Sequence, residues 1–111
     1  MPAPPILGEF EHIVLLAILR LGDAAYGVAI RNEIRETTGR EPAPGALYTT
    51  IDRLEDKGLL TSTFGDPTPQ RGGRAKRYVK VSAQGLRAVN HARQCYLRLW
   101  DGLPFAGVSH V

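Results

Sequence analysis

The chain has 111 residues, of which 43% are hydrophobic, so it is long enough for one packed domain, too short for two, and not disordered throughout. Its single cysteine excludes an intrachain disulfide framework and a cysteine-based zinc cluster, and its longest strongly apolar run, Ile13 to Leu19, is far shorter than the roughly 20 residues that cross a membrane. The net charge of +3 is unevenly placed, because residues 66–80 carry five cations and one acid and leave the rest at −1. With no secretory signal pattern at the N-terminus, these features predict a soluble cytoplasmic protein.

The N-terminal third begins with a predicted flexible arm, residues 1–6, and a helix that starts near Leu7. Apolar residues recur along one stripe of this helix: Phe10, Val14, Ala17, Ile18 and Leu21. Ile13, Leu16 and Leu19 widen that stripe until little of the helix is polar. A helix that is apolar nearly all round needs partners on more than one side. We therefore expect Phe10, Ile13 and Leu16 to contact a second subunit.

Two further helices are predicted in the middle of the chain. Gly22 and Asp23 interrupt the first helix, and a second follows over residues 26–38 and ends at Gly39. Its inward candidates are Val28, Ile30 and Ile34. Prolines make residues 41–45 a short extended connection. A third helix is expected from about Gly45 to Lys57, with Leu47, Ile51 and Leu54 facing inward.

After the third helix the apolar period changes to that of strands. Leu60 to Phe64 alternates and is rich in β-branched residues, and Lys76 to Val81 reads as the returning strand of a hairpin. Val79 and Val81 should face the core, with Lys76, Tyr78 and Lys80 on the other face. Ser82 is a good N-cap for a final helix over residues 83–101, and residues 102–111 are expected to be a flexible tail.

The element order indicates a mainly α protein with a small β-hairpin: a winged helix-turn-helix plus a C-terminal dimerisation helix. The DNA-binding domain would cover residues 7–81 and the dimerisation helix residues 82–101. Residues near the start of the third helix are small or hydrogen-bonding, as suits the floor of a major groove. The expected contacts from this recognition helix are Gly45, Ala46, Tyr48, Thr49, Thr50 and Arg53. For Tyr48, covering the edge of the core is the alternative role, and the later acids Glu55 and Asp56 would be repelled by phosphate.

The hairpin loop combines glycine with four cations, which favours a tip that follows the sugar-phosphate backbone or enters the minor groove. The expected wing contacts are Arg71, Gly72, Gly73, Arg74, Lys76 and Arg77. A charge run alone is also typical of a solvated face, and the agreement between charge location and element order favours DNA binding.

Several segments, taken in chain order, resemble the PadR family of bacterial transcriptional regulators. They are Leu-Gly-Glu-Phe-Glu at 7–11, Tyr-Gly at 26–27, Gly-Ala-Leu-Tyr-Thr-Thr-Ile-Asp-Arg-Leu-Glu-Asp-Lys-Gly-Leu-Leu at 45–60, Gly-Arg-Ala-Lys-Arg-Tyr at 73–78 and Val-Ser-Ala-Gln-Gly at 81–85. The resemblance implies a homodimer on a palindromic operator, usually a repressor and sometimes released by a small effector. It also implies that Tyr48 and the wing cations contact DNA. The short C-terminal region resembles the compact subfamily with a single dimerisation helix.

The final helix carries a stripe with heptad-like spacing, in which Arg93 is the exception. The expected dimer seam on this helix is Leu86, Val89, Arg93, Tyr96, Trp100 and Leu103. Tyr96 and Trp100 are the aromatic residues of the seam and are candidates for stacking on a small hydrophobic or aromatic effector; plain dimer packing is the alternative for Trp100. Cys95 fits a small buried hydrophobe better than a redox switch.

Other functional classes fit the sequence less well. His12, His91 and His110 are scattered and lie beside no evident nucleophile or ligand set, so neither catalysis, a metal nor a cofactor is expected. The remaining alternatives are a winged-helix module that binds protein without DNA, a regulator of the MarR-like type, and an RNA-binding protein. The basic wing, the short length and the lack of clustered aromatic residues argue against these in turn.

Overall fold

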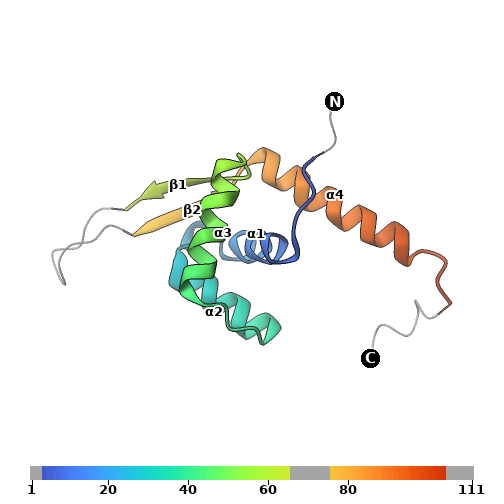
Figure 1. The fold of residues 1–111 in the computed structure, drawn as a ribbon, viewed down its shortest axis with the longest axis horizontal. Coiled ribbons are helices and arrows are strands. Elements are labelled where there is room, and N and C mark those ends of the chain that lie inside the picture. Colours follow the sequence, from blue (N-terminus) through green and yellow to red (C-terminus); the bar gives the residue numbers. More distant parts are fainter. Residues whose placement is uncertain (1–3, 66–75, 105–111) are drawn as a thin grey trace.

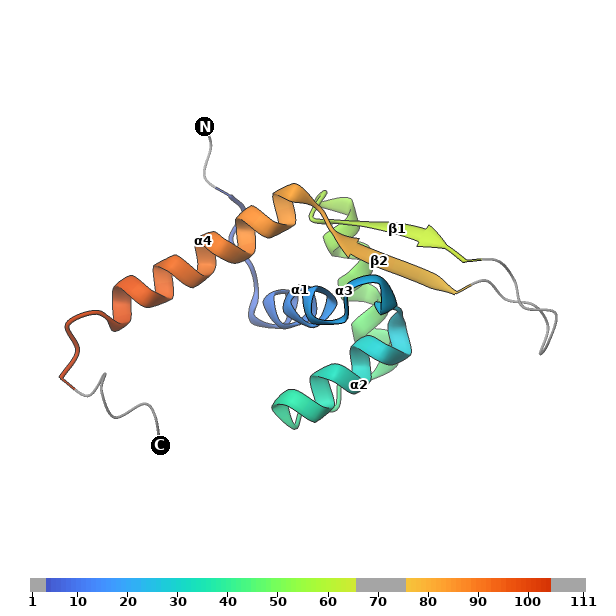
Figure 2. The ribbon, with the colours of Figure 1, turned by 180° about the vertical axis from the view of Figure 1, so that it is seen from behind.

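The structure is a computed structural model that describes residues 4–65 and 76–104. The chain runs through α1 (Glu9–Leu21), the 3-10 turn η1 (Gly22–Ala24), α2 (Gly27–Thr38), α3 (Pro44–Asp56), β1 (Leu60–Phe64), β2 (Arg77–Val81) and α4 (Ala83–Trp100). The hairpin and the far end of α4 extend in opposite directions from the body formed by α1, α2 and α3 (Figures 1 and 2). This confirms the predicted element order, with element ends displaced by at most two residues.

Local sequence signals explain where the helices begin and end. Gly39 closes α2 with φ of +80°, a left-handed conformation that glycine adopts without steric cost. Pro44 opens α3, where its missing N–H would have had no helical partner. The Ser82 hydroxyl oxygen accepts a 3.0 Å hydrogen bond from the Gly85 N–H and caps α4 as predicted.

Helix α1 is the centre of the core and contacts α2, α3, α4 and β2. Its residues Val14, Leu15, Ala17 and Ile18 are buried. The predicted inward residues of the other elements are also buried: Ile30, Ile34, Leu47, Ile51, Leu54 and Val79. Val28 was expected to join them, but its side chain is 59% exposed. The expectation is wrong because Val28 lies about 200° around the helix from Ile30, which sets the buried face of α2.

The hairpin is antiparallel and is attached to the corner between α1 and α2. Leu60 pairs with Val81 and Phe64 with Arg77 at the two ends of its register. The Val79 N–H donates a 2.9 Å hydrogen bond to the Ala25 carbonyl, and Tyr26 forms an isolated bridge with Tyr78. The base of the wing is therefore fixed to the start of α2. Among residues 4–65 and 76–104, no helix combines the length and apolar content that crossing a membrane requires.

Candidate nucleic-acid interface

The first two turns of α3 present an accessible face that lacks acidic residues in its first turn. Four of the predicted contacts, Gly45, Ala46, Tyr48 and Thr49, are exposed in these two turns, and Arg53 is exposed one turn after Thr49. The opposite side of the helix is buried against the core through Leu47, Ile51 and Leu54. Helix α3 thus offers hydrogen-bonding side chains and a helix N-terminus to the outside, a combination that suits a polar, negatively charged partner.

Thr50 corrects the predicted set of contacts. Its side chain is only 4% exposed, so it belongs to the buried face of α3. At 100° per residue, Thr50 lies about 40° from Leu54 around the helix. The buried arc is wider than the three leucine and isoleucine positions indicate, and Thr50 is not available to a duplex.

Tyr48 connects the exposed face of α3 with the start of α2. A Cβ atom on Gly27 would overlap the Tyr48 hydroxyl, so the phenol lies directly over the Gly27 backbone. Tyr48 nevertheless remains 42% exposed. Both roles considered for this residue are therefore compatible: the ring covers the edge of α2 and still faces outward. Only glycine at position 27 leaves room for this contact.

The wing base continues the same surface. The Lys76 ammonium lies 4.4 Å from the centroid of the Tyr26 ring, and the Tyr26 and Tyr78 rings meet edge-on at 5.6 Å. Lys76 is exposed, so its ammonium group stays accessible to a partner while the face of the Tyr26 ring holds it in place. The predicted tip contacts Arg71, Gly72, Gly73 and Arg74 lie outside the described residues.

Arg77 has a different role from the one predicted. Its guanidinium donates to Asp52 at 2.7 Å, to Glu55 at 2.6 Å and to the Ser62 hydroxyl at 3.0 Å. Burial alone would lower its pKa, but the two carboxylates outweigh that effect and raise the pKa of Arg77. The Ser62 hydroxyl and Arg77 together lower the pKa of Glu55. Arg77 thus joins the wing to α3, which corrects the expectation of a phosphate contact.

Glu11 is a buried acid that the sequence reasoning did not single out. Its carboxylate accepts from the Lys57 ammonium at 2.8 Å and from the Gly8 N–H at 2.9 Å. Burial by itself raises the pKa of Glu11. The hydrogen bonds from Lys57 and Gly8 and the charges of Lys57 and Arg53 lower it by more, so the net shift is downward. The available signal was one half of a capping box, since Glu11 is the third residue of α1 and its carboxylate accepts from the N–H of the N-cap residue Gly8.

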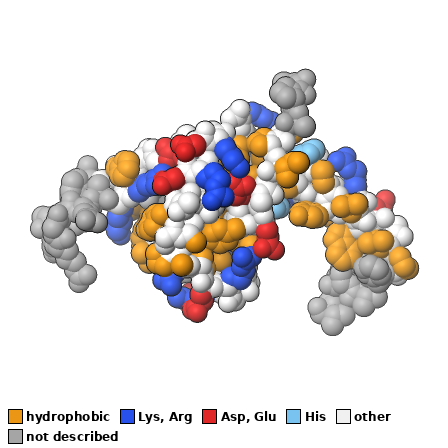
Figure 3. Space-filling view, viewed as in Figure 1, with side chains coloured by type: hydrophobic (Ala, Val, Ile, Leu, Met, Phe, Trp, Pro, Cys, Tyr) orange, Lys and Arg blue, Asp and Glu red, His pale blue; other side chains and the backbone are white. Residues whose placement is uncertain are grey.

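The opposite end of the molecule is apolar. In the outer half of α4 (residues 93–100), Tyr96, Leu97, Leu99 and Trp100 are 46–72% exposed, and hydrophobic side chains gather along this helix (Figure 3). Leu86 and Leu103 of the predicted seam are also exposed, as is Leu16 on α1. Phe10 and Ile13 are partly buried against the protomer's own core. Val89 is 5% exposed and packs within the protomer, which corrects its assignment to the dimer seam.

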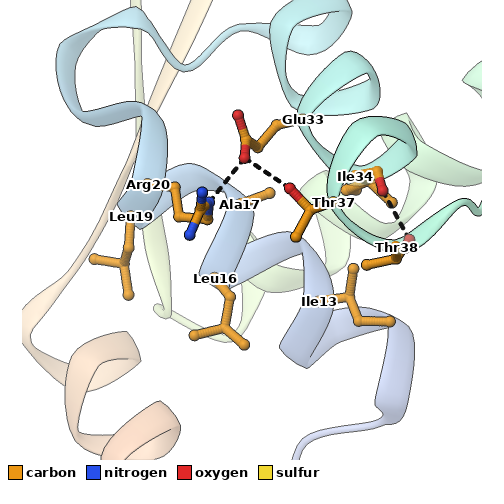
Figure 4. Close-up of a pocket in the computed structure, with 9 residues that line it drawn as sticks. All are labelled: Ile13, Leu16, Ala17, Leu19, Arg20, Glu33, Ile34, Thr37 and Thr38. Atoms are coloured by element: carbon orange, nitrogen blue, oxygen red, sulfur yellow. Dashed lines mark hydrogen bonds and ion pairs between the residues drawn. The ribbon is translucent and has the colours of Figure 1, made fainter. Parts of the chain in front are cut away.

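Two grooves lie on either side of the exposed α1 residue Leu16. One, of about 270 Å³, lies between α1 and α4 and is lined by His12, Leu16, Val89, Arg93, Tyr96, Leu97 and Trp100. The other, of about 450 Å³, lies between α1 and α2 and is mostly apolar, with the Arg20–Glu33 ion pair beside it (Figure 4). Leu16 lines both grooves. Burial lowers the pKa of His12, which favours its neutral form in the first groove. Cys95 is half-buried, with Sγ 3.6 Å from the His91 Nε2 atom.

Comparisons with known proteins identify the family. A family model described as the transcriptional regulator PadR-like family matches residues 15–91. The curated protein "transcriptional activator GvpE2" of Halobacterium salinarum is 27% identical over 94 residues, which are 85% of this chain and 44% of that protein. The chain thus spans less than half the length of this relative.

Solved structures support the same assignment. A PadR family transcriptional regulator from Eggerthella lenta superposes with a TM-score of 0.64 and 27% identity, over 85% of this chain and 81% of that one. F93 from STIV, a winged-helix DNA-binding protein, superposes with a TM-score of 0.67 and 17% identity, over 88% of this chain and 98% of that one. The second likeness shows the winged-helix fold. The family match over most of its length shows that the chain belongs to the PadR-like family of transcriptional regulators, a family of regulators rather than of enzymes.

Proposed function

We propose that this regulator binds double-stranded DNA as a homodimer at a two-fold symmetric operator and represses transcription there. The observation that carries the proposal is the continuous surface from α3 to the wing. Tyr48 lies over Gly27, and the residue before that glycine, Tyr26, holds Lys76 at the wing base. A recognition helix and a basic wing that share one rigid surface can engage one duplex together.

The recognition helix would supply base contacts. Thr49 is exposed on the first turns of α3, and its hydroxyl and methyl groups suit a base acceptor or a thymine methyl. Tyr48 could donate its hydroxyl to a phosphate, as could the N–H groups at the start of α3. The wing cations Arg71, Arg74 and Lys76 would add sequence-independent phosphate contacts.

Dimer formation is supported by the exposed apolar residues of α4. Leu97, Leu99 and Trp100 are 51%, 72% and 46% exposed in the single protomer. A soluble domain rarely leaves such a contiguous apolar surface uncovered. A second copy packed by two-fold symmetry would cover it and place two α3 helices about 34 Å apart, one turn of DNA.

A small hydrophobic or aromatic effector would bind near the dimer centre and release the DNA. The groove between α1 and α4 offers the Tyr96 and Trp100 rings and a neutral His12. Its volume of about 270 Å³ approaches that of small-ligand sites. A ligand that binds only one arrangement of the two protomers would shift the DNA affinity by its preference for that arrangement.

Repression follows from occlusion, since a dimer that covers a full turn of duplex blocks access to an overlapping promoter. GvpE2 is named as an activator, so a reporter assay decides the direction for this chain. We expect reporter output to rise when the regulator is deleted. A fall in output would assign activation instead.

Selection of bound duplexes from a random library tests the binding proposal. We expect a two-fold symmetric motif, with half-sites about one helical turn apart. The logarithm of affinity should fall linearly with the logarithm of salt, by about 0.9 per phosphate contact. The Arg71→Ala/Arg74→Ala double variant should weaken binding to every sequence and reduce the slope by about 2. Absence of duplex binding, or a flat salt dependence, would favour a module that binds protein instead.

A further inference from the structure

An acidic residue lies in the middle of the exposed face of α3. Asp52 follows Tyr48 by one helical turn, and around the helix it lies between Tyr48 and Thr49. Its side chain is 63% exposed. An acid at this place needs an explanation, because a carboxylate is repelled by the phosphates on both sides of a groove.

The wing neutralises this acid only in part. Asp52 Oδ1 accepts from Arg77 at 2.7 Å, but the same guanidinium also binds Glu55 at 2.6 Å. These three side chains carry a net charge of −1. Figure 3 shows acidic and basic side chains next to each other on the face that α3 shares with the hairpin. The Glu55 carboxylate is further held by the Ser62 hydroxyl, whereas Asp52 Oδ2 accepts no hydrogen bond from the described residues.

The chemistry of base edges then determines what this free oxygen can accept. A carboxylate only accepts hydrogen bonds, and guanine and thymine present acceptors in the major groove, which repel it. Adenine offers an amino group but places the N7 acceptor beside it. Cytosine offers its N4 amino group and no acceptor of its own at that edge.

We propose that Asp52 determines specificity by accepting a hydrogen bond from the N4 amino group of a cytosine, and that Arg77 is the residue that positions it. This inference rests on the proposed function, in which α3 lies in the major groove. Arg77 fixes the orientation of the carboxylate through Oδ1 and leaves Oδ2 to the base. It also lowers the repulsion that an unpaired acid would meet in the groove.

Selection from a random duplex library tests the proposal with four variants beside the wild type. Asp52→Asn removes the charge and keeps the size. Asp56→Asn is the matched control, because it removes one exposed acid from the same helix one turn later. Arg77→Gln releases Asp52 while retaining hydrogen-bonding capacity, and Arg77→Lys restores the positive charge.

We expect Asp52→Asn to lose a cytosine preference of about 5- to 150-fold at one position in each half-site. The rest of the motif should be unchanged, and non-specific binding should become tighter because a negative charge is gone. Arg77→Gln should lose the preference at the same position, and Arg77→Lys should regain part of it. Asp56→Asn should tighten all binding slightly and keep the wild-type motif.

Two results would overturn the proposal. If Asp52→Asn selects the wild-type motif, the carboxylate reads no base. If Arg77→Gln weakens all positions equally, Arg77 supports the fold alone and does not position Asp52. A wild-type protein that selects no motif would instead refute the proposed function, and that outcome is distinct from both.

Discussion

The α3–hairpin surface and the outer half of α4 differ in how many of their side chains find partners within a single protomer. On the first surface, Arg77 has bound carboxylates, Tyr48 has its place over Gly27, and Lys76 rests on an aromatic ring. On the second, Leu97 and Leu99 are more than half exposed. The first surface is preorganised for a polar partner, whereas the second lacks an apolar one.

This difference shows how the two kinds of surface are stabilised. A charged partner such as DNA is attracted without apolar burial, so the protein can satisfy its own polar groups before binding. Apolar side chains stabilise a complex only when they leave water, by about 25 cal/mol for each Å² of apolar surface that is buried. In the proposed complex, dimerisation through α4 would therefore depend on protein concentration and DNA binding through α3 on salt, and variants can separate the two.

The largest expected effect is the loss of the dimer in Leu97→Glu. A buried, unpaired carboxylate in an apolar interface is strongly unfavourable, so the variant should be monomeric at micromolar concentration in sedimentation experiments. Because a monomer engages one half-site, affinity for the full operator should fall by at least about 100-fold. Gln94→Glu adds the same charge on the exposed polar side of α4 and should remain dimeric. If the Leu97→Glu protein is still dimeric, the outer half of α4 does not form the dimer interface.

The next effect concerns Glu11, which links α1 to the end of α3. The pKa of Glu11 lies below its ordinary value, so its contribution to stability is complete above about pH 4.5 and is lost as the pH falls through the lowered pKa. Glu11→Gln keeps an acceptor for Gly8 but loses the charge that Lys57 binds, and should reduce the free energy of unfolding at pH 7 by about 1–2 kcal/mol. Its stability should also decline less on acidification.

Denaturant unfolding at pH 7 and pH 3, at one fixed protein concentration, measures both effects. Glu9→Gln is the control, because Glu9 is 81% exposed in its pair with Arg40. This control should change stability by less than about 0.5 kcal/mol. Equal losses for the two variants would mean that the burial of Glu11 has no energetic consequence.

Thr49→Ala should act on sequence preference and leave the dimer intact. If Thr49 contacts a base directly, the variant should lose about 1–3 kcal/mol of discrimination at one or two base pairs. Competition between operator duplexes with single substitutions measures this loss. A uniform weakening on all duplexes would make Thr49 a backbone contact.

The smallest effect is expected for Lys76→Ala. Loss of one phosphate contact should weaken binding several-fold on every duplex and reduce the salt slope by about 0.9. Lys80→Ala is a useful comparison, because Lys80 is exposed within β2 and lies nearer the protein body than Lys76, which precedes that strand. A change in base preference, instead of in the slope, would contradict a backbone role for Lys76.

Much of the fold follows from local sequence signals. Proline, glycine and apolar periodicity fix the element ends to within two residues, and the alternation of β2 identifies Val79 as inward. The errors arise where a residue's neighbours come from elsewhere in the chain. Spacing alone could not show that Thr50 and Val89 lie on buried arcs within the protomer. Val28 was also misplaced: its apolar side chain suggested a buried position, but it lies on the exposed side of α2.

The charged residues were the hardest to predict. Arg77 belongs to a basic run in the sequence, but its partners Asp52 and Glu55 come from a different element. Asp52 itself was not singled out, since nothing local marks an acid that a strand 25 residues later will bind. The exposed face of α3 was otherwise predictable, because apolar periodicity defines the buried side and leaves the remainder outside.

The buried residues of α4, namely Gly85, Ala88 and Val89, all lie in its first half. The 18-residue helix is about 27 Å long, and its buried end contacts β2 at the base of the wing. A tilt of about 10° would move its far end by about 5 Å, more than the 3.4 Å rise of one base pair. Small angular changes at the centre of a dimer would therefore alter the register between two half-sites, and operators with altered spacing would report that angle.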